Sequence, residues 1–417
     1  MTCLLLVAGA AFGRRDLVAL AVPFVLGTAV SLLRRPVTPP RARLEVPTYV
    51  LPEGQAMDVT IVVESDETLD VVAVTTRADR WLGVVDGQIS RATRLAAGDE
   101  ASFPVRVRAL RWGRHVLGPV TVRATACDGL LACLPQTAPA EGISVLPVGE
   151  PFSAVDAVPR AAGIVGAHRS RRPGEGGELA GVRQFSTGDR LRRIDWRVSL
   201  RSREMYVTST LSERDTDVVV LLDVLHEVGP SGGVDGAASS LDTSVRAAGA
   251  LTEHYLGTGD RVGLVEYGAR LRYLPPRAGR PQVRRALTWL RDVAVLPEGN
   301  DSSVRLLGPR VLPPQALLIV LTPLVDQRTA TILASLARRA QSIVCVDTLP
   351  PGVRPAGVGE WSDLAWRLWQ LDRAAVIARL REVGVPVVAW EGTGSLDLVL
   401  RDASRMPAAA HSLGASR

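Results

Sequence analysis

The chain has 417 residues, of which 47% are hydrophobic, and its formal net charge is +6 at pH 7. This length suggests two or three domains, and the high apolar content suggests a segment that faces a membrane. All 49 basic residues are arginine, and an excess of positive charge this modest does not by itself predict a polyanionic partner. The four cysteines show no CxxC or Cys/His cluster, so zinc-type spacing is excluded. Cys127 and Cys133 are interpreted as a disulfide, if the chain is exported, or as buried reduced thiols.

Two apolar runs open the chain, at residues 2–13 and 17–33. A membrane-spanning helix needs about 20 apolar residues, and roughly 17 is the lower limit. The second run therefore qualifies, whereas the first is short unless the true start lies upstream of Met1. The charged residues between them, Arg14–Asp16, predict the turn of a helical hairpin. We expect residues 1–36 to form a transmembrane hairpin or anchor that contacts membrane lipid.

Arginines on the two sides of this segment predict its orientation. Four of them (Arg34, Arg35, Arg41 and Arg43) follow the second run, against two in the turn. This difference favours a cytoplasmic carboxyl-terminal side, so we expect a protein of the cell membrane with a cytoplasmic main body. The alternative is a signal peptide cleaved near Ala8–Ala11. Such a peptide would lack a basic region before its apolar run, and a second apolar run follows at once.

Residues 41–150 alternate between apolar and polar side chains. Phe103, Val105 and Val107, for example, alternate with arginines, and turn signals recur at short spacing. Several short strands spaced in this way predict an antiparallel β-sandwich of immunoglobulin-like type. We find no residues in this region that indicate chemistry.

Residues 217–402 alternate between buried strands and amphipathic helices, with one hairpin after the first helix. This pattern predicts an α/β fold with an open, mostly parallel, doubly wound sheet. Ligands of such sheets bind at the carboxyl ends of strands, near a switch in strand order. The strand ends in question carry Asp223, Thr322 and Asp347. Residues 403–417, rich in Ala and Ser, are expected to be a disordered tail.

The order of these elements resembles the von Willebrand factor A fold, which is Rossmann-like. The resemblance implies a divalent metal held by Asp-x-Ser-x-Ser after the first strand, a Thr from a later loop and an Asp after the fourth strand. Here Asp223 is present, but Leu225 and Glu227 replace both serines, and Pro323 follows Thr322 where Asp is expected.

The candidate metal ligands that remain are Asp223, Ser302 and Thr322, the second of these from the loop that also contains Asp301 and Ser303. Hard oxygen ligands suit a divalent cation, but the set is incomplete. We therefore expect a degenerate metal site and no cofactor. Substitute oxygens from Glu227 and Asp326 remain an open alternative.

Residues 151–216 are predicted to be a linker that contains an arginine-rich segment. Residues 168–214 contain eleven arginines and six acidic residues. Within them, Gly188-Asp189 predicts a turn followed by a helix N-cap. Leu191, Ile194 and Val198 would then form one apolar stripe of that helix.

The sequence GVRQFSTGDRLRRIDWRVSLR, residues 181–201, resembles a bacterial family catalogued as domain of unknown function 58. The family signature runs through an arginine, an aromatic residue, Gly-Asp and Arg-x-Ile-Asp-Trp into an A-type domain. The positions that match are Arg183, Phe185, Gly188, Asp189, Arg193, Ile194, Asp195, Trp196 and Arg201. Residues 111–131 also resemble the family segment that precedes the signature.

This resemblance implies a membrane-anchored protein associated with MoxR-type AAA+ ATPases and transglutaminase-like membrane proteins, in the assembly or maturation of other complexes. We therefore expect a non-catalytic scaffold or adaptor. One alternative is an outward-facing, metal-dependent adhesion module. Another is an enzyme, although the sequence has no Walker loop, G-x-S-x-G or H-E-x-x-H motif. His226 is the one histidine near the predicted switch point.

Three roles are open for the arginine-rich segment. It is interpreted as a brace that clamps the A-type domain onto the β domain through Arg–carboxylate pairs, as a docking surface for a partner protein, or as a site for anionic lipid or nucleic acid. Interleaved acidic residues disfavour nucleic acid, because a phosphate-binding stripe should be nearly free of them. The residues assigned to the brace or docking role are Arg183, Phe185, Gly188, Asp189, Arg193, Asp195, Trp196 and Arg201.

Overall fold

The structure is a computed structural model with two compact units, Met1–Val145 and Leu146–Arg417. Each unit is described by itself. The residues that the structure describes are 2–33, 35–86, 90–148, 173–185, 194–211, 217–296, 307–308, 311–313, 316–338, 342–353 and 361–390.

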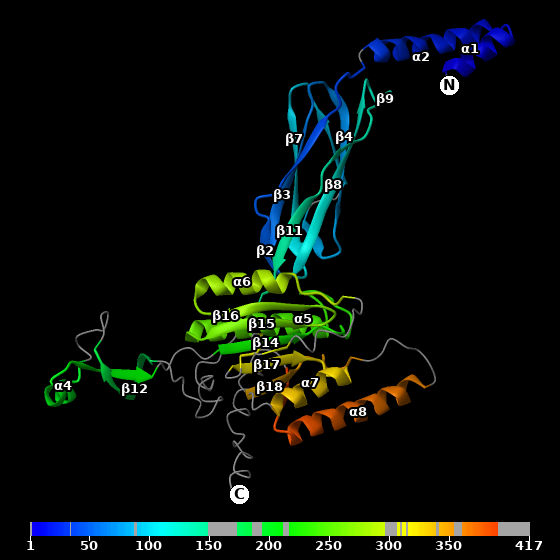
Figure 1. Ribbon diagram of the computed structural model, residues 1–417. Coiled ribbons are helices and arrows are strands. Elements are labelled where there is room, and N and C mark those ends of the chain that lie inside the picture. The colour runs from blue at the N-terminus through cyan, green and yellow to red at the C-terminus, as the bar shows by residue number, and fades with distance from the viewer. Residues whose placement is uncertain are drawn as a thin grey trace. The chain divides into compact units, whose positions relative to one another are not determined.

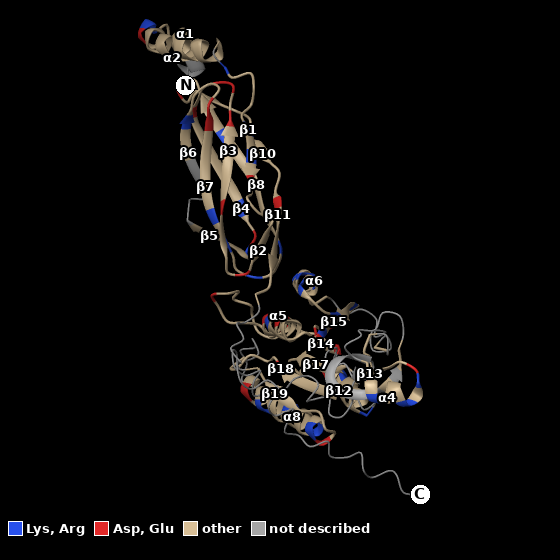
Figure 2. Ribbon diagram, turned by 90° about the vertical axis from the view of Figure 1, so that its left-hand side faces the viewer, with Lys and Arg blue, Asp and Glu red and all other residues tan. Residues whose placement is uncertain are grey.

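Two apolar helices, α1 (Thr2–Ala11) and α2 (Arg15–Leu33), open the first unit and pack against each other. They approach closely at Gly9, where a Cβ atom would lie 2.7 Å from Val18 Cγ2. The helical hairpin follows the predicted apolar runs, and Figure 2 shows charge gathered at its turn. Helix α2, with a mean hydropathy of 2.1, is long and apolar enough to cross a membrane.

Two antiparallel sheets form the rest of the first unit (Figure 1). One has the strand order β1-β3-β7-β5 and the other β2-β11-β8-β4-β6, with β9 and β10 also paired to β8. The strands are β1 (Arg41–Glu45), β2 (Val50–Pro52), β3 (Ala56–Glu64), β4 (Leu69–Ala78), β5 (Leu82–Asp86), β6 (Ser90–Leu95), β7 (Glu100–Ala109), β8 (Gly113–Ala126), β9 (Leu131–Ala132), β10 (Gln136–Ala138) and β11 (Glu141–Leu146).

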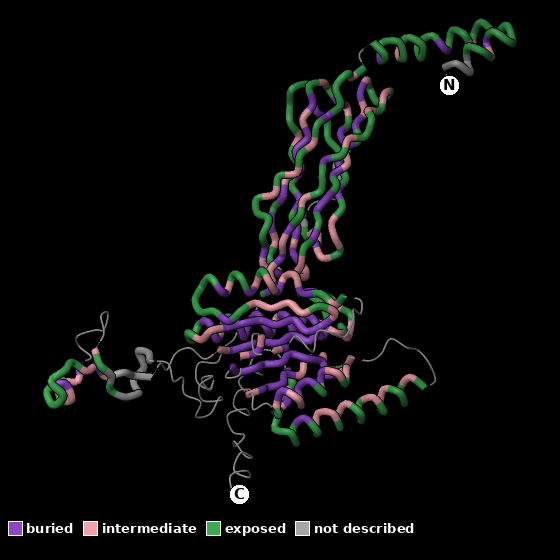
Figure 3. The backbone as a smooth tube through the Cα atoms, in the orientation of Figure 1, coloured by how far each residue is buried: buried purple, intermediate pink, exposed green. Residues whose placement is uncertain are grey.

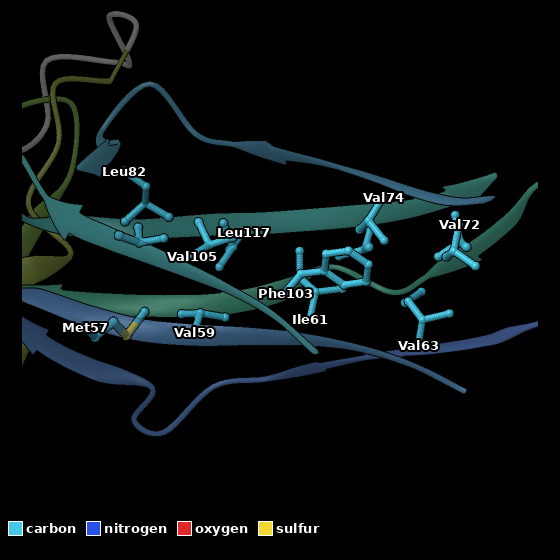
Figure 4. Close-up of a cluster of buried hydrophobic side chains, with 14 of the residues drawn as sticks. Met57, Val59, Ile61, Val63, Val72, Val74, Leu82, Phe103, Val105 and Leu117 are labelled. Atoms are coloured by element: carbon cyan, nitrogen blue, oxygen red, sulfur yellow. The ribbon is translucent and has the colours of Figure 1, made fainter. Parts of the chain in front are cut away.

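The two sheets share one hydrophobic core, shown in Figure 4. Phe103 and Val105 of β7 are buried in it with Met57 of β3, and Val74 and Leu117 reach it from the second sheet. Strand β7 alternates between buried and exposed residues, as its sequence predicts, because successive side chains of a strand point to opposite faces.

A six-stranded sheet forms the centre of the second unit, in the order β16-β15-β14-β17-β18-β19. All its pairings are parallel except that of β16, which runs antiparallel to β15 as the predicted hairpin. The strands are β14 (Asp217–Asp223), β15 (Arg261–Tyr267), β16 (Leu271–Arg277), β17 (Leu317–Thr322), β18 (Ser342–Asp347) and β19 (Val387–Ala389).

Helices lie on both faces of this sheet, and its four central strands, β15, β14, β17 and β18, are buried between them (Figures 1 and 3). Helix α5 (Ser240–Thr258) begins at a capping box formed by Ser239 and Asp242, and it contacts β14, β15 and β17. It packs against α6 (Arg280–Arg291). On the other face, α7 (Gln327–Ala337) contacts β18 and α8 (Ser362–Glu382) contacts β19. The mixed α/β architecture predicted for this half of the chain is therefore confirmed.

The signature segment contains regular structure of its own. Strand β12 (Pro173–Gln184) pairs antiparallel with β13 (Tyr206–Leu211), and a short helix, α4 (Trp196–Ser202), lies between them in the sequence. The predicted apolar helix stripe is wrong at Ile194, which is extended and forms a β-bridge with Val207. The helix begins two residues later, because Ile194 is buried against β13 instead. The predicted N-cap at Asp189 lies outside the described residues.

Candidate functional site

The switch in strand order lies between β14 and β17, which are neighbours although helix α5 and the β15–β16 hairpin separate them in the sequence. Strand order runs outward from this pair in both directions, and their carboxyl ends meet at one edge of the sheet. Asp223 ends β14 and Thr322 ends β17. These two residues, both predicted as site residues, are thus brought together.

The carboxylate of Asp223 is only 3% exposed and receives three hydrogen bonds. Its Oδ2 accepts one from Thr322 Oγ1 (2.7 Å) and one from Thr329 Oγ1 (2.9 Å), and its Oδ1 accepts one from the Leu225 backbone N–H (3.2 Å). Burial raises the pKa of Asp223, although these hydrogen bonds oppose the shift. Asp223 therefore connects the carboxyl ends of β14 and β17 to the first turn of α7, through Thr322 and Thr329.

The hydroxyl of Thr322 also orders the loop after β17. It accepts a hydrogen bond from the Leu324 backbone N–H (3.0 Å) while it donates to Asp223. Leu324 has φ +52°, a left-handed conformation that is uncommon for a residue with a side chain. Its side chain is buried in the core beside α7, and this packing offsets a backbone cost of about 1–3 kcal/mol.

Two of the three candidate metal ligands, Asp223 and Thr322, are hydrogen-bonded to each other. The two oxygens of Asp223 together accept three hydrogen bonds from the protein, so a cation at this carboxylate would compete with those donors. Ser302 lies outside the described residues. Glu227, proposed as a substitute, accepts a hydrogen bond from Ser239 Oγ (2.6 Å). Within the described part of the chain, no group of three His, Cys, Asp or Glu side chains is placed to hold a metal ion.

Asp326, the other substitute, is the N-cap of α7 and the centre of a polar cluster. It accepts hydrogen bonds from the Arg328 backbone N–H (2.8 Å) and guanidinium (2.6 Å), and His226 Nε2 lies 3.2 Å from its Oδ2. Burial opposes ionisation of Asp326, but the hydrogen bonds from Arg328 and His226 outweigh it and lower its pKa. The cluster joins the loop after β14 to the start of α7.

This cluster predicts a loss of stability in acid. A carboxyl whose pKa is lower in the folded state than its ordinary value of 3.8 stabilises the fold above that value. The contribution is lost as the pH falls below about 4 and through the folded-state pKa. We expect Asp326→Asn to lose about 1–2 kcal/mol of unfolding free energy at pH 7 and less at pH 3. Hydrogen exchange of the α7 amides at both pH values measures this; an equal loss at both would contradict it.

Asp347, at the end of β18, is held by an arginine that the sequence did not indicate. Arg373 of α8 lies 2.5 Å from Asp347 Oδ1, and it donates two hydrogen bonds to the Pro323 carbonyl (3.1 and 3.2 Å). Both side chains are largely buried. Beside them lies a cleft of about 490 Å³, lined partly by the stacked rings of Trp366 and Trp369.

The signature residues have different structural roles: some pair strands, one caps a helix and others are exposed. Arg183 pairs through its backbone with Val207, and the Phe185 N–H donates to the Met205 carbonyl (2.8 Å). Asp195 is the N-cap of α4: its Oδ1 accepts from the N–H groups of Arg197 (3.1 Å) and Val198 (3.2 Å). The others that the structure describes, Trp196 and Arg201, are exposed on α4. Gly188, Asp189 and Arg193 lie outside the described residues.

Sequence reasoning missed Ser199, which joins α4 to β13. Its buried hydroxyl donates to the Asp195 carbonyl (2.7 Å) and accepts from the Tyr206 N–H (2.9 Å). A small polar residue four positions after an N-cap was the available signal, since Ser in a helix often bonds the preceding turn. The contacts described for the segment thus stabilise α4 and the β12–β13 pair locally. The brace between the two domains stays a prediction.

Removal of the Asp195 cap is expected to loosen α4. Asp195→Ala leaves two helix N–H groups without their acceptor, at a cost of about 1 kcal/mol. Faster hydrogen exchange at Arg197 and Val198 would show this. Asp195→Asn keeps an accepting oxygen and should preserve most of the protection. Equal exchange in wild type and Asp195→Ala would contradict the capping role.

The chain thus combines an apolar N-terminal helix, an antiparallel β unit and a mixed α/β unit preceded by the signature segment. Residues 181–351 match the family model described as Protein of unknown function DUF58. The match confirms the resemblance carried by the signature: residues 181–351 belong to this family.

Uncharacterized proteins of Mycobacterium bovis and Mycobacterium tuberculosis are similar to this chain, with 31% identity over 137 residues. The aligned region is 32% of this chain and spans about 40% of the length of those relatives. Among solved structures, alpha-2-macroglobulin from Escherichia coli aligns with 29% of this chain and 21% of its own, at 20% identity and a TM-score of 0.23. A TM-score this low supports no inference about this chain.

Proposed function

We propose that this protein is a membrane-anchored, non-catalytic scaffold that binds partner proteins during assembly or maturation of a complex, with a MoxR-type AAA+ ATPase as its partner. Other membrane proteins, including transglutaminase-like ones, would belong to the same assembly. The proposal follows from what the resemblance of the signature to this family implies, and the match of residues 181–351 to the family model supports that resemblance.

The apolar hairpin supports the membrane anchor. Helix α2 has the length and hydropathy of a spanning helix, and arginines are more numerous after it than in the turn before it. We infer a cytoplasmic main body from this distribution. The two sheets that follow, with their shared core, are those of an immunoglobulin-like sandwich in our interpretation.

The α/β unit supports a binding role. Numbered along the unit, its strand order is 3-2-1-4-5-6 with the third strand antiparallel, which we interpret as a von Willebrand factor A-like fold. Asp223 would hold the metal in such a fold, but here its oxygens are occupied by Thr322, Thr329 and Leu225. We infer that partners are bound here without a metal. This disfavours the metal-dependent adhesion module.

One observation carries the docking proposal: α4 presents an exposed aromatic residue on a helix that is fixed in place. Trp196 is 62% exposed, and Leu200, one turn later, is also exposed. Asp195 and Ser199 meanwhile hold the helix start and its inner face. Exposed Trp and Arg side chains on a rigid element are the residues that most often dominate protein–protein binding.

The test is capture of partners by the tagged full chain from gently solubilised membranes, with ATP present, read by mass spectrometry. We expect an AAA+ ATPase with wild type and about thirtyfold weaker binding with Trp196→Ala, since a central Trp contributes at least about 2 kcal/mol. Tyr49→Ala, which removes another exposed aromatic residue, is the matched control.

Equal recovery with all three chains would show that α4 is a local brace and not the docking surface. Absence of any ATPase from wild type would contradict the scaffold proposal itself. Calorimetry with magnesium or manganese tests the alternative of a metal-dependent adhesion module. Such a module requires saturable binding of the metal ion, and Asp223→Ala should abolish that binding.

A further inference from the structure

Helix α8 carries an apolar stripe on its exposed face. Leu364, Leu368, Leu371, Ala375 and Ala378 follow one another at alternating spacings of four and three residues, and all five are exposed. Leu371 is 68% exposed. Figure 3 shows that much of α8 is exposed along its length. Alternating spacings of four and three are the heptad pattern of a coiled-coil seam.

The opposite face of α8 is already used within its own unit. Leu380 is buried in the core beside α7, with Val376 and Ile377 packed against it. Trp369 and Arg373 of the same face line the cleft at the end of β18. The first apolar face of α8 thus packs against its own unit. The stripe is a second apolar face, and its residues are exposed.

Charges beside the stripe favour a particular partner. With Leu364 and Leu371 at d positions and Leu368 at a, Arg367 is at g and Asp372 at e of the next heptad. In a parallel pair of identical helices, a g residue lies beside the partner's following e residue, so Arg367 and Asp372 would attract each other twice across the two-fold axis. Neither side chain has an ion-pair or hydrogen-bond partner within the described residues.

An antiparallel pair would instead place e beside e and g beside g, which brings like charges together. We propose that the stripe Leu364–Ala378 of α8 is a dimerisation surface, and that a second copy of this chain binds it as a parallel two-helix seam. This inference is independent of the proposed ATPase partner, because its readout is self-association.

The test is sedimentation of the purified full chain in detergent, over a range of chain concentrations. We expect a dimer for wild type and a monomer for Leu371→Asp, which places a charge in the seam. Arg367→Asp or Asp372→Arg alone should weaken the dimer about tenfold, because attraction becomes repulsion at both symmetric contacts. The double variant Arg367→Asp/Asp372→Arg should restore the dimer.

A second experiment identifies the seam directly. Leu371→Cys should form an intermolecular disulfide under mild oxidation, because identical d residues face each other in a parallel pair. Gln370→Cys, also exposed but off the stripe, is the matched control, and wild type controls for the native cysteines. A monomeric wild-type chain, or a double variant that fails to restore association, would overturn the proposal and assign the stripe to another occupant.

Discussion

Asp223→Ala is expected to lower the free energy of unfolding of the α/β unit by about 3–5 kcal/mol. The substitution removes the acceptor of three donors at once: the hydroxyls of Thr322 and Thr329 and the N–H of Leu225. Each buried donor left unsatisfied costs about 1–3 kcal/mol, and the three are not additive. Hydrogen exchange of the β14 and β17 amides in the full chain measures this loss within the unit concerned.

Asp223→Asn is the matched variant, because it keeps the size of the side chain and one accepting oxygen. We expect it to cost about 1–2 kcal/mol, since its amide group opposes one of the donors. A loss below about 1 kcal/mol for Asp223→Ala would contradict the role of Asp223 as a tie between strand ends.

A comparison of wild type with Asp223→Asn distinguishes the effect of the Asp223 charge from that of its hydrogen bonds. Burial raises the pKa of Asp223, so between its ordinary value of 3.8 and the raised value the folded state holds a proton that the unfolded state has released. Stability from this group therefore falls as the pH rises through that interval. Asp223→Asn, which does not titrate, should lack this decrease.

Arg272→Ala is expected to destabilise the same unit by a similar amount, about 3–5 kcal/mol, because its partner is a buried carboxylate on β15, the strand beside β14. Glu266 on β15 is fully buried and is paired with Arg272 and, more weakly, with Arg270 (3.3 Å). Arg272 also lies over the Trp289 ring of α6, 4.4 Å from its centroid. Loss of Arg272 removes this stacking and leaves a buried carboxylate with a partly exposed partner.

The control for this prediction removes both charges. Glu266→Leu/Arg272→Met replaces the pair by apolar side chains, and such replacements are often neutral or stabilising. We expect the double variant to be at least about 2 kcal/mol more stable than Arg272→Ala in the same exchange measurement. If the double variant were no more stable, the effect of Arg272→Ala would come from lost stacking and not from an unpaired charge.

The elements of both units follow from the sequence. The period-two pattern of β7 buries Phe103 and Val105, and the apolar run before Asp223 is a central strand. The prediction from sequence is wrong where a local pattern of spacing competes with a strand partner from elsewhere in the chain. Ile194 fits a helix stripe by spacing, but it pairs with Val207 because β13 offers a partner that spacing alone does not show.

The sequence by itself determined the order of strands and helices, the apolar N-terminal segment and the signature that defines the family, because each depends on neighbours along the chain. Tertiary structure alone decided what the polar residues do. Thr329 and Arg373 give no local signal, yet one binds Asp223 and the other Asp347. The reason is that strand order brings distant strand ends to one edge, where buried carboxylates must find donors from whichever helix packs there.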